Sequence, residues 1–125
     1  MASEVHVVSS ESFAKNGHLL SDWYNGVYVN FFPPEERDSF EKLKEEFEIA
    51  SKAIDSGKKP NYYPYLVSAT VNGRTVGGIH GYYLPHGNLG YVDYIIVESD
   101  FGKGGTTRTI FETLVASLKK KKQLA

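Results

Sequence analysis

Hydrophobic residues recur along the first third of the chain with two different periods. Over residues 4–9 they alternate with polar residues, which predicts a short strand. From 18 to 31 the apolar residues recur at steps of three and four, at Leu20, Trp23, Val27 and Phe31. This spacing places them on one face of a helix, which Gly26 weakens locally.

A second helix is expected from the paired prolines onward. The sequence Pro-Pro-Glu-Glu at 33–36 provides a fixed φ for a first turn and acidic residues near the positive end of the helix dipole. The apolar residues that follow again share one face, at Phe40, Leu43, Phe47, Ala50 and Ile54. Gly57 and Pro60 should end this helix.

The middle of the chain is rich in tyrosine, valine and isoleucine and predicts a three-stranded antiparallel meander. Residues 62–71 and 74–84 are joined by Asn72 and Gly73, which tolerate the positive φ of a tight hairpin turn. A second turn at 85–88 leads into a strand at 91–97. The tyrosines at 62–63 and 82–83 are expected to pack across strands rather than to flank a substrate.

Three glycines and two threonines separate that last strand from a final amphipathic helix. The apolar face of this helix contains Ile110, Phe111, Leu114, Val115 and Leu118. Four lysines at 119–122 lie at its end, where the helix dipole favours cations. The expected fold is therefore a single α+β domain over residues 1–125, with the order β-α-α-β-β-β-α.

Composition excludes several classes of function. A net charge of -1 favours neither nucleic acid nor an anionic membrane as a partner, and no apolar stretch approaches the roughly 18 residues of a membrane span. The chain has no cysteine, and its four histidines are scattered at no metal-ligand spacing, so no metal site is predicted. The start of the chain lacks an apolar signal segment, and we expect a cytoplasmic protein.

The glycine segment has the features of a phosphate site. A strand that enters a helix through glycines leaves backbone N–H groups unpaired, and the helix dipole adds positive charge to them. The residues that could contact a phosphate are Gly102, Lys103, Gly104, Gly105, Thr106, Thr107 and Arg108. A glycine-rich turn that binds nothing fits the spacing equally well.

Two common phosphate motifs do not fit this segment. A P-loop has a lysine directly after its last glycine, where this chain has Thr106. The dinucleotide fingerprint needs a third glycine at the position of Thr107 and an acidic residue about 20 positions later, beyond the end of the sequence.

Residues 95–111 resemble, without gaps, motif A of the GNAT acetyltransferase superfamily, I-x-V-x-P-x-Y-R-G-x-G-[IL]-G-x-x-L-[LF]. The matching positions are Val97, Phe101, Gly105, Ile110 and Phe111. The sequence departs from the motif at Ser99, Gly102 and Thr107. The resemblance implies a GNAT-like mixed sheet that is truncated after the motif A helix, without the later strands and helix of the full fold.

The resemblance also implies a chemistry, the direct transfer of an acetyl group from acetyl-CoA to an amine. Carried over by position, residues 102–107 would hold the pyrophosphate of acetyl-CoA. Ile95, Ile96 and Val97 would lie beside its pantetheine arm. Backbone N–H groups near Ile96 and Val97 would then polarise the thioester carbonyl.

Asp93, His80 and Glu98 are the candidates for the base that such a reaction needs. Asp93 is the first choice because it lies in an apolar strand, where loss of hydration favours the protonated carboxyl. Strict alternation would place it on the face of Ile95 and Val97, opposite Glu98. A paired structural carboxylate at position 93 fits the sequence as well, and a lone strand histidine such as His80 is more often only packed.

The predicted function is therefore acetyl-CoA-dependent N-acetyl transfer to an amine, by a whole enzyme or by a fragment or half-site of one. The alternative is a non-catalytic CoA-binding or assembly module derived from such an enzyme. A crossover helix after a strand leads to a parallel strand, and none follows in this sequence. We therefore expect a second copy or another chain to complete the sheet.

Overall fold

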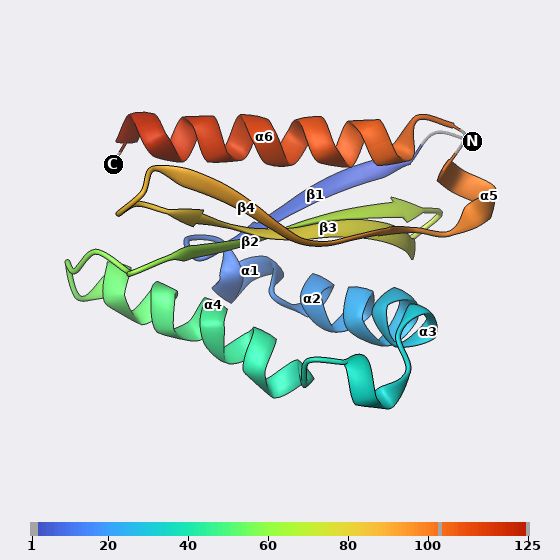
Figure 1. Ribbon diagram of the computed structural model, residues 1–125, viewed down its shortest axis with the longest axis horizontal. Helices are drawn as coiled ribbons and strands as arrows, with labels where there is room; N and C mark the ends of the chain where they lie inside the picture. Colours follow the sequence, from blue (N-terminus) through green and yellow to red (C-terminus); the bar gives the residue numbers. More distant parts are fainter. Residues whose placement is uncertain (1–2, 103, 125) are drawn as a thin grey trace.

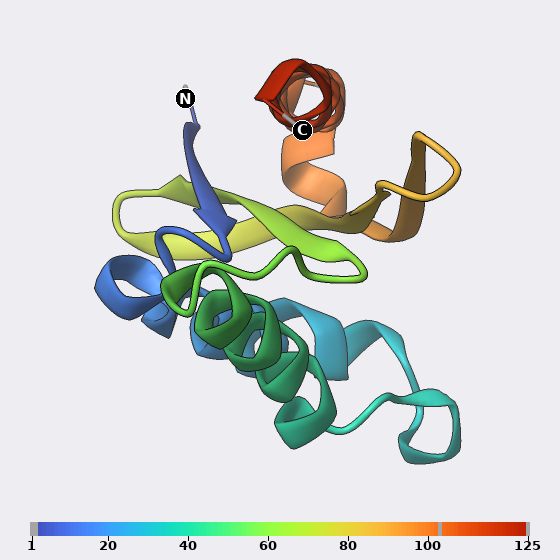
Figure 2. The ribbon, with the colours of Figure 1, turned by 90° about the vertical axis from the view of Figure 1, so that its left-hand side faces the viewer.

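The computed structural model describes residues 3–102 and 104–124. A four-stranded sheet lies between two layers of helices (Figure 1). Helix α6 (Thr106–Leu124) covers one face of the sheet. The other face carries α1 (Phe13–Asn16), α2 (His18–Trp23), α3 (Val29–Phe31) and α4 (Phe40–Asp55). Figure 2 shows the same three layers from the side, with α6 on one side of the sheet and α1 to α4 together on the opposite side.

The sheet has the order β1-β2-β3-β4, and each neighbouring pair is antiparallel. Its strands are β1 (Glu4–Ser9), β2 (Tyr63–Val71), β3 (Arg74–Leu84) and β4 (Leu89–Val97). The predicted hairpin is confirmed, with Asn72 and Gly73 at φ 51° and 78°. The α+β class and the element order are also confirmed. A mixed sheet would need a parallel strand beside β4, and the strands that the structure describes make only antiparallel pairs.

The first predicted helix is present, but it contains a π-helical turn. Residues Tyr24–Tyr28 form this turn between α2 and α3, around the glycine expected to weaken the helix. The neighbours Val27 and Tyr28 are both fully buried there, together with Trp23. A π turn accommodates one extra residue, so adjacent side chains can both face the core. The short α1 before this segment was not predicted.

The start predicted for the second helix was wrong. Residues Pro34–Glu36 form a single 3-10 turn, and α4 begins only at Phe40. Ser39 caps α4, because its side chain accepts a hydrogen bond from the N–H of Lys42. Arg37 lies between the two segments, and its guanidinium donates to the carbonyls of Val29, at the start of α3, and of Phe32, directly after it. Capping and this tertiary contact outweigh the local preference of the prolines.

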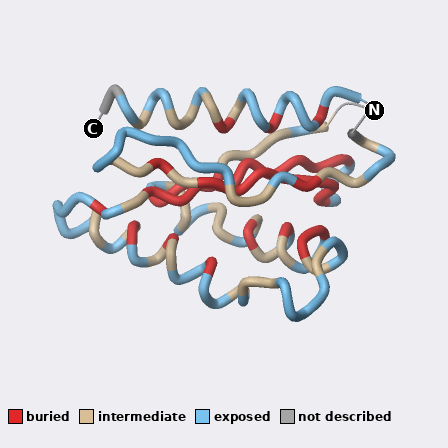
Figure 3. The backbone as a smooth tube through the Cα atoms, viewed as in Figure 1, coloured by how far each residue is buried: buried red, intermediate tan, exposed pale blue. Residues whose placement is uncertain are grey.

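Two apolar cores lie on the two faces of the sheet, and buried backbone is concentrated in the central strands (Figure 3). Under α6, Ile110 and Leu114 are fully buried against residues of β2 and β3. Phe111 was predicted to join them, but it is 47% exposed. The second core lies between the sheet and helices α1 to α4, on the lower face of the sheet in Figure 1. It contains Val8, Leu20, Trp23, Val27, Tyr28, Leu43, Phe47, Leu66 and Ile96.

None of the helices in the described ranges is long and apolar enough to cross a membrane.

A glycine in β3 makes the packing of the second core possible. A Cβ at Gly78 would lie 2.7 and 2.8 Å from ring atoms of the buried Trp23, and 3.1 Å from the carbonyl oxygen of Val67. We expect Gly78→Ala to lower the free energy of unfolding by about 1–3 kcal/mol, because the indole has no room to move. Urea unfolding measures this change.

Gly26→Ala is the matched control, since a Cβ at Gly26 would meet no atom within 4 Å. It should leave stability unchanged or raise it by up to about 1 kcal/mol, because alanine favours a helix more than glycine. Equal effects of the two substitutions would contradict the packing argument.

Candidate functional site

Strand β4 carries a bulge at its centre. Gly81 pairs with Val92 and His80 pairs with Tyr94, so Asp93 is an extra residue without a partner in β3. Bulges bend a strand, increase its twist and redirect a side chain. Here the redirected side chain is the carboxylate that the sequence singled out as a base.

The bulge corrects the predicted faces of β4. Tyr94 and the buried Ile96 lie in the core below the sheet, whereas Val97 packs against the core under α6. Asp93 contacts His80 on the lower face, which is the face of Tyr94 and not that of Val97. Strict alternation fails because the extra residue shifts the period by one position.

Asp93 and His80 form a close pair. Nδ1 of His80 lies 3.3 Å from Oδ2 of Asp93, with the Asp93 side chain 21% exposed and the His80 side chain fully buried. Aromatic rings surround the imidazole, with Trp23 stacked at 6.1 Å and Tyr82 edge-on at 5.1 Å between ring centroids. Of the two side chains, only that of Asp93 is exposed to solvent, and the imidazole of His80 is enclosed beside it.

Tyr82 connects Asp93 to helix α4. Its hydroxyl donates to Oε1 of Glu46 at 2.6 Å and lies 3.5 Å from Oδ2 of Asp93. Burial and the hydrogen bond to Glu46 raise the pKa of Tyr82, so this hydroxyl remains a donor at neutral pH. One hydroxyl therefore lies between two carboxylates on the same face of the sheet.

A second tyrosine and carboxylate pair holds the segment before α4 against β4. The Tyr94 hydroxyl donates to Oδ2 of Asp38 at 2.6 Å and accepts from the Tyr28 hydroxyl at 3.1 Å. The Tyr28 hydroxyl accepts in turn from the N–H of Asp38 at 2.8 Å. The hydrogen bond from Tyr94 holds the pKa of Asp38 below its usual range, with a further contribution from Lys42.

Sequence reasoning did not predict Glu46 or Asp38 as parts of the site. Glu46 lies directly before the buried Phe47 and three residues after Leu43, so it borders the apolar face of α4. This position was a usable signal for contact with the sheet. Asp38 gave no such signal, because its partner Tyr94 lies 56 residues away.

The glycine segment contains a helical turn and a left-handed glycine. α5 (Ser99–Gly102) was not predicted, and it is followed by a bond from the N–H of Gly104 to the carbonyl of Phe101. Gly105 has φ 86°, which a side chain would strain. Its carbonyl accepts from the N–H of Thr109 at 2.9 Å, so the N–H groups of residues 106–108 form the open first turn of α6.

The side chains of this segment differ in their access to solvent. Thr106 is buried, and its hydroxyl lies 3.2 Å from the Ser3 hydroxyl near the start of the chain. Thr107 and Arg108 are exposed, and Nε of Arg108 is 2.6 Å from Oε1 of Glu112. Lys103 lies outside the described residues. This part of the predicted phosphate site therefore offers backbone N–H groups, one hydroxyl and one guanidinium.

Strand β4 is an edge strand, and its backbone N–H groups alternate between the sheet and the open side. The N–H of Glu98 donates to the Val76 carbonyl of β3 at 2.9 Å. By alternation, the N–H of Ile96 also faces β3, and those of Ile95 and Val97 face the open edge. Of the two predicted oxyanion donors, Val97 is thus better placed than Ile96. Glu98 itself pairs with Arg74 at 3.0 Å.

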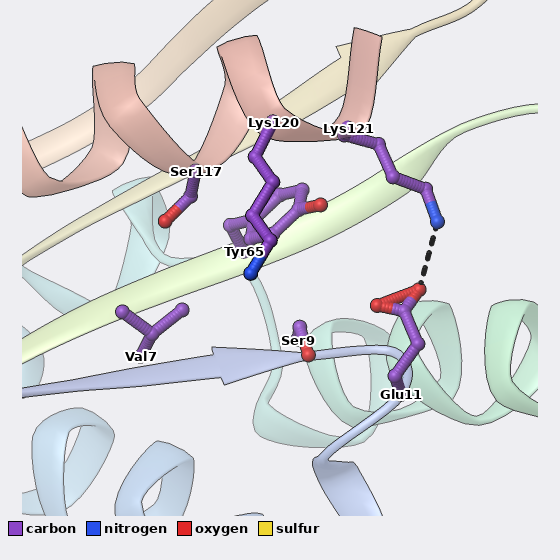
Figure 4. Close-up of a pocket in the computed structure, with 7 residues that line it drawn as sticks. All are labelled: Val7, Ser9, Glu11, Tyr65, Ser117, Lys120 and Lys121. Atoms are coloured by element: carbon purple, nitrogen blue, oxygen red, sulfur yellow. Dashed lines mark hydrogen bonds and ion pairs between the residues drawn. The ribbon is translucent and has the colours of Figure 1, made fainter. Parts of the chain in front are cut away.

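A separate cavity of about 390 Å³ lies between β1, β2 and the end of α6 (Figure 4). Its walls include Tyr65 and Lys120, and an ion pair of 3.0 Å between Lys121 and Glu11 lies at its side. Tyr65 belongs to the core under α6. This cavity therefore lies on the face opposite Asp93 and is not part of the candidate site.

The fold is shared with proteins of known structure. No family model matches the sequence, and no curated protein matches it. A structure search finds an aminoglycoside acetyltransferase from an uncultured soil metagenomic sample, with 18% identity and a TM-score of 0.60. The alignment covers 97% of this chain and 74% of that one.

A second aminoglycoside acetyltransferase from an uncultured soil metagenomic sample was solved with trehalose and with sisomicin. It is 14% identical in both structures, with TM-scores of 0.59 and 0.58, and the alignments cover 95% of this chain and 71% of that one. The chain therefore has the GNAT-type acetyltransferase fold that motif A predicted.

The bond from Tyr94 to Asp38 should stabilise the fold in a pH-dependent way. We expect Tyr94→Phe to lower the free energy of unfolding at neutral pH by about 1–2 kcal/mol, because a partly buried donor to a carboxylate is lost. The pKa of Asp38 is lowered in the folded state, so the stability linked to it is complete above the unfolded pKa. This stability is lost as the pH falls through the folded-state pKa of Asp38. The difference in free energy of unfolding between the wild-type protein and Tyr94→Phe should therefore narrow in that range.

Urea unfolding of both proteins at neutral and acidic pH measures this narrowing. The exposed Tyr91, on the same strand, is the control, and Tyr91→Phe should change stability by less than about 0.5 kcal/mol. A difference for Tyr94→Phe that stays constant with pH would show that the carboxylate of Asp38 is not involved.

Proposed function

We propose that this chain is an N-acetyltransferase that transfers the acetyl group of acetyl-CoA to an amine. The observation that carries the proposal is the bulge in β4, which places a solvent-accessible carboxylate on a strand that runs directly into a glycine-rich helix start. The amine acceptor is supported by the two similar folds, both aminoglycoside acetyltransferases. The absence of cysteine is consistent with a cytoplasmic enzyme.

The residues at the start of α6 fit a pyrophosphate. Gly102, Gly104 and Gly105 have no Cβ, so a ligand could approach their backbone closely. The N–H groups of the first turn of α6 lie at the positive end of the helix dipole, which favours an anion. Thr107 and Arg108 add a hydroxyl and a mobile positive charge. Lys103 and the N–H of Thr106 belong to the same proposed set. Acetyl-CoA would supply the acetyl group and a thiolate leaving group.

In this proposal Asp93 is the base and His80 positions it. Asp93 takes a proton from the ammonium group of the substrate, and the free amine attacks the thioester carbonyl. The N–H groups of Val97 and Ile95 face the open edge, where they can donate to the developing oxyanion. The carbon–sulfur bond then breaks, and the thiolate takes up a proton. Ile96 contributes a buried side chain that fixes the strand from below.

We also propose that a second copy of this chain, or another chain, lies against the edge of β4. Val92 and Ile95 on this edge are 41% and 44% exposed, and Phe111 of the adjoining helix is 47% exposed. An edge strand with apolar side chains is a surface for pairing with a further strand. Such a strand would form the second wall of a cleft beside Val97.

Asp93→Asn should lower kcat/KM for acetyl transfer by about a hundredfold or more, because the amide cannot accept the proton. Release of the CoA thiol in the presence of a panel of amines measures the rate. Calorimetry with acetyl-CoA should give the same affinity for both proteins, since Asp93 lies away from the helix start. Asp22→Asn, at an exposed position of α2, is the charge-matched control and should keep full activity.

Binding of acetyl-CoA without acetylation of any amine would contradict the proposed acetyltransferase activity and favour the non-catalytic CoA-binding module. Failure of both binding and turnover in a folded protein would contradict the whole proposal.

The association at β4 is tested by sedimentation. We expect a mass of about twice 14.0 kDa for a homodimer, and its loss in Ile95→Lys, because a buried ammonium opposes strand pairing. Ile49→Lys is the control, since Ile49 is 53% exposed on α4, away from this edge. A monomer at high concentration would exclude self-association.

A further inference from the structure

An open cavity of about 350 Å³ adjoins Asp93 on the face of the sheet covered by α4. It is lined by Glu46, Tyr62, Tyr82, Leu84 and Tyr91. Tyr82 belongs to the cavity wall and also lies 3.5 Å from the carboxylate of Asp93, so cavity and base share one side chain. The mechanism proposed above uses Asp93 and leaves the rest of this cavity without a role.

Three tyrosine rings form the walls of this cavity at angles to one another. Tyr62 and Tyr82 meet edge to face with centroids 5.7 Å apart, and Tyr82 and Tyr91 are tilted with centroids 6.2 Å apart. Tyr91 is 55% exposed although it is a large aromatic residue within a strand. Several aromatic faces around a common space are typical of sites for organic cations, because the ring quadrupole attracts positive charge.

The charges around the cavity favour a cation. The carboxylate of Glu46 accepts from Tyr82, and no described cation forms an ion pair with Glu46. The nearby Lys42 has its ammonium 3.0 Å from Asp38. The pKa of Lys42 is raised chiefly by the hydrogen bond to Asp38, and the charges of Glu46 and Asp93 raise it further. An ammonium in this region is therefore stabilised by both carboxylates of the site.

We propose that the acceptor is a polyamine, and that Glu46 and the tyrosines bind its second ammonium group while Asp93 receives the proton of the amine that reacts. This inference rests on the proposed function, since it assigns the substrate class of the same site. One hydroxyl joins the two carboxylates, so two nitrogens of one small molecule can reach both. A monoamine would leave the Glu46 carboxylate unused, and an amino acid would bring its own carboxylate against it.

Binding without acetyl-CoA tests this subsite separately from the reaction. Calorimetry with 1,4-diaminobutane and with spermidine should detect binding that n-butylamine does not show. Glu46→Gln should weaken it by about tenfold, since the aromatic walls remain but the charge is lost. The amide oxygen of the substituted side chain can still accept from Tyr82, which preserves the local structure. Added salt should weaken diamine binding to the wild-type protein more than diamine binding to the Glu46→Gln variant.

Glu45→Gln is the matched control, because it removes the same charge from the neighbouring, exposed position of α4. It should change diamine affinity by less than about twofold. Tyr62→Leu tests the aromatic wall and should weaken diamine binding by several-fold. Circular dichroism checks that Glu46→Gln and Tyr62→Leu are folded. Equal affinity of wild type and Glu46→Gln for spermidine would overturn the subsite.

Kinetics separate this inference from the proposed function. If the chain is an acetyltransferase, Glu46→Gln should raise KM for 1,4-diaminobutane by about tenfold, and the control Glu45→Gln should leave both KM and kcat unchanged. Acetyl transfer with no preference for diamines would overturn the inference and leave the proposed function intact. If polyamines bind in a way that depends on Glu46 but no acetyl group is transferred, the result would support the subsite and contradict the proposed acetyltransferase activity.

Discussion

The register shift between β3 and β4 is the constraint on which the candidate site depends. One extra residue in β4 brings the carboxylate of Asp93 to His80, and it places Tyr94 and Ile96 in the core below the sheet. Without it, the alternation of the strand would direct Asp93 toward α6. The same strand continues into the glycine segment, so one backbone element sets the distance between the proposed base and the proposed phosphate site.

Tyrosine hydroxyls connect the helical layer to this strand. Tyr82 reaches Glu46 on α4, and Tyr94 reaches Asp38 directly before that helix. Each bond joins a donor on the sheet to a partly buried carboxylate of the helical layer, and burial of a carboxylate has to be compensated by such bonds. The position of α4, and with it one wall of the tyrosine-lined cavity, is therefore coupled to the position of β4. Stability and the proposed acceptor site share these bonds.

The charge distribution shows why the net charge of the chain says little about its ligands. A value of -1 means that neither sign of charge dominates the whole chain, but acidic side chains lie beside the tyrosines and a helix start offers N–H groups at the end of β4. An amine would then approach the centre of β4, and an anionic cofactor would approach its end. This separation of charge along β4 is what makes the two proposed ligands compatible.

Much of the fold could be predicted because the signals are local. The alternation of 4–9, the Asn72 and Gly73 turn and the helix after the glycine segment depend on neighbouring residues, and the structure confirms these elements. The start of α4, the π turn and the exposure of Phe111 depend on contacts between distant segments, and the sequence pattern did not predict them. The sequence by itself determined that an aspartate and a histidine stand on adjacent strands. Only the tertiary structure decided that they meet, because a bulge exists only in the register of one strand against another.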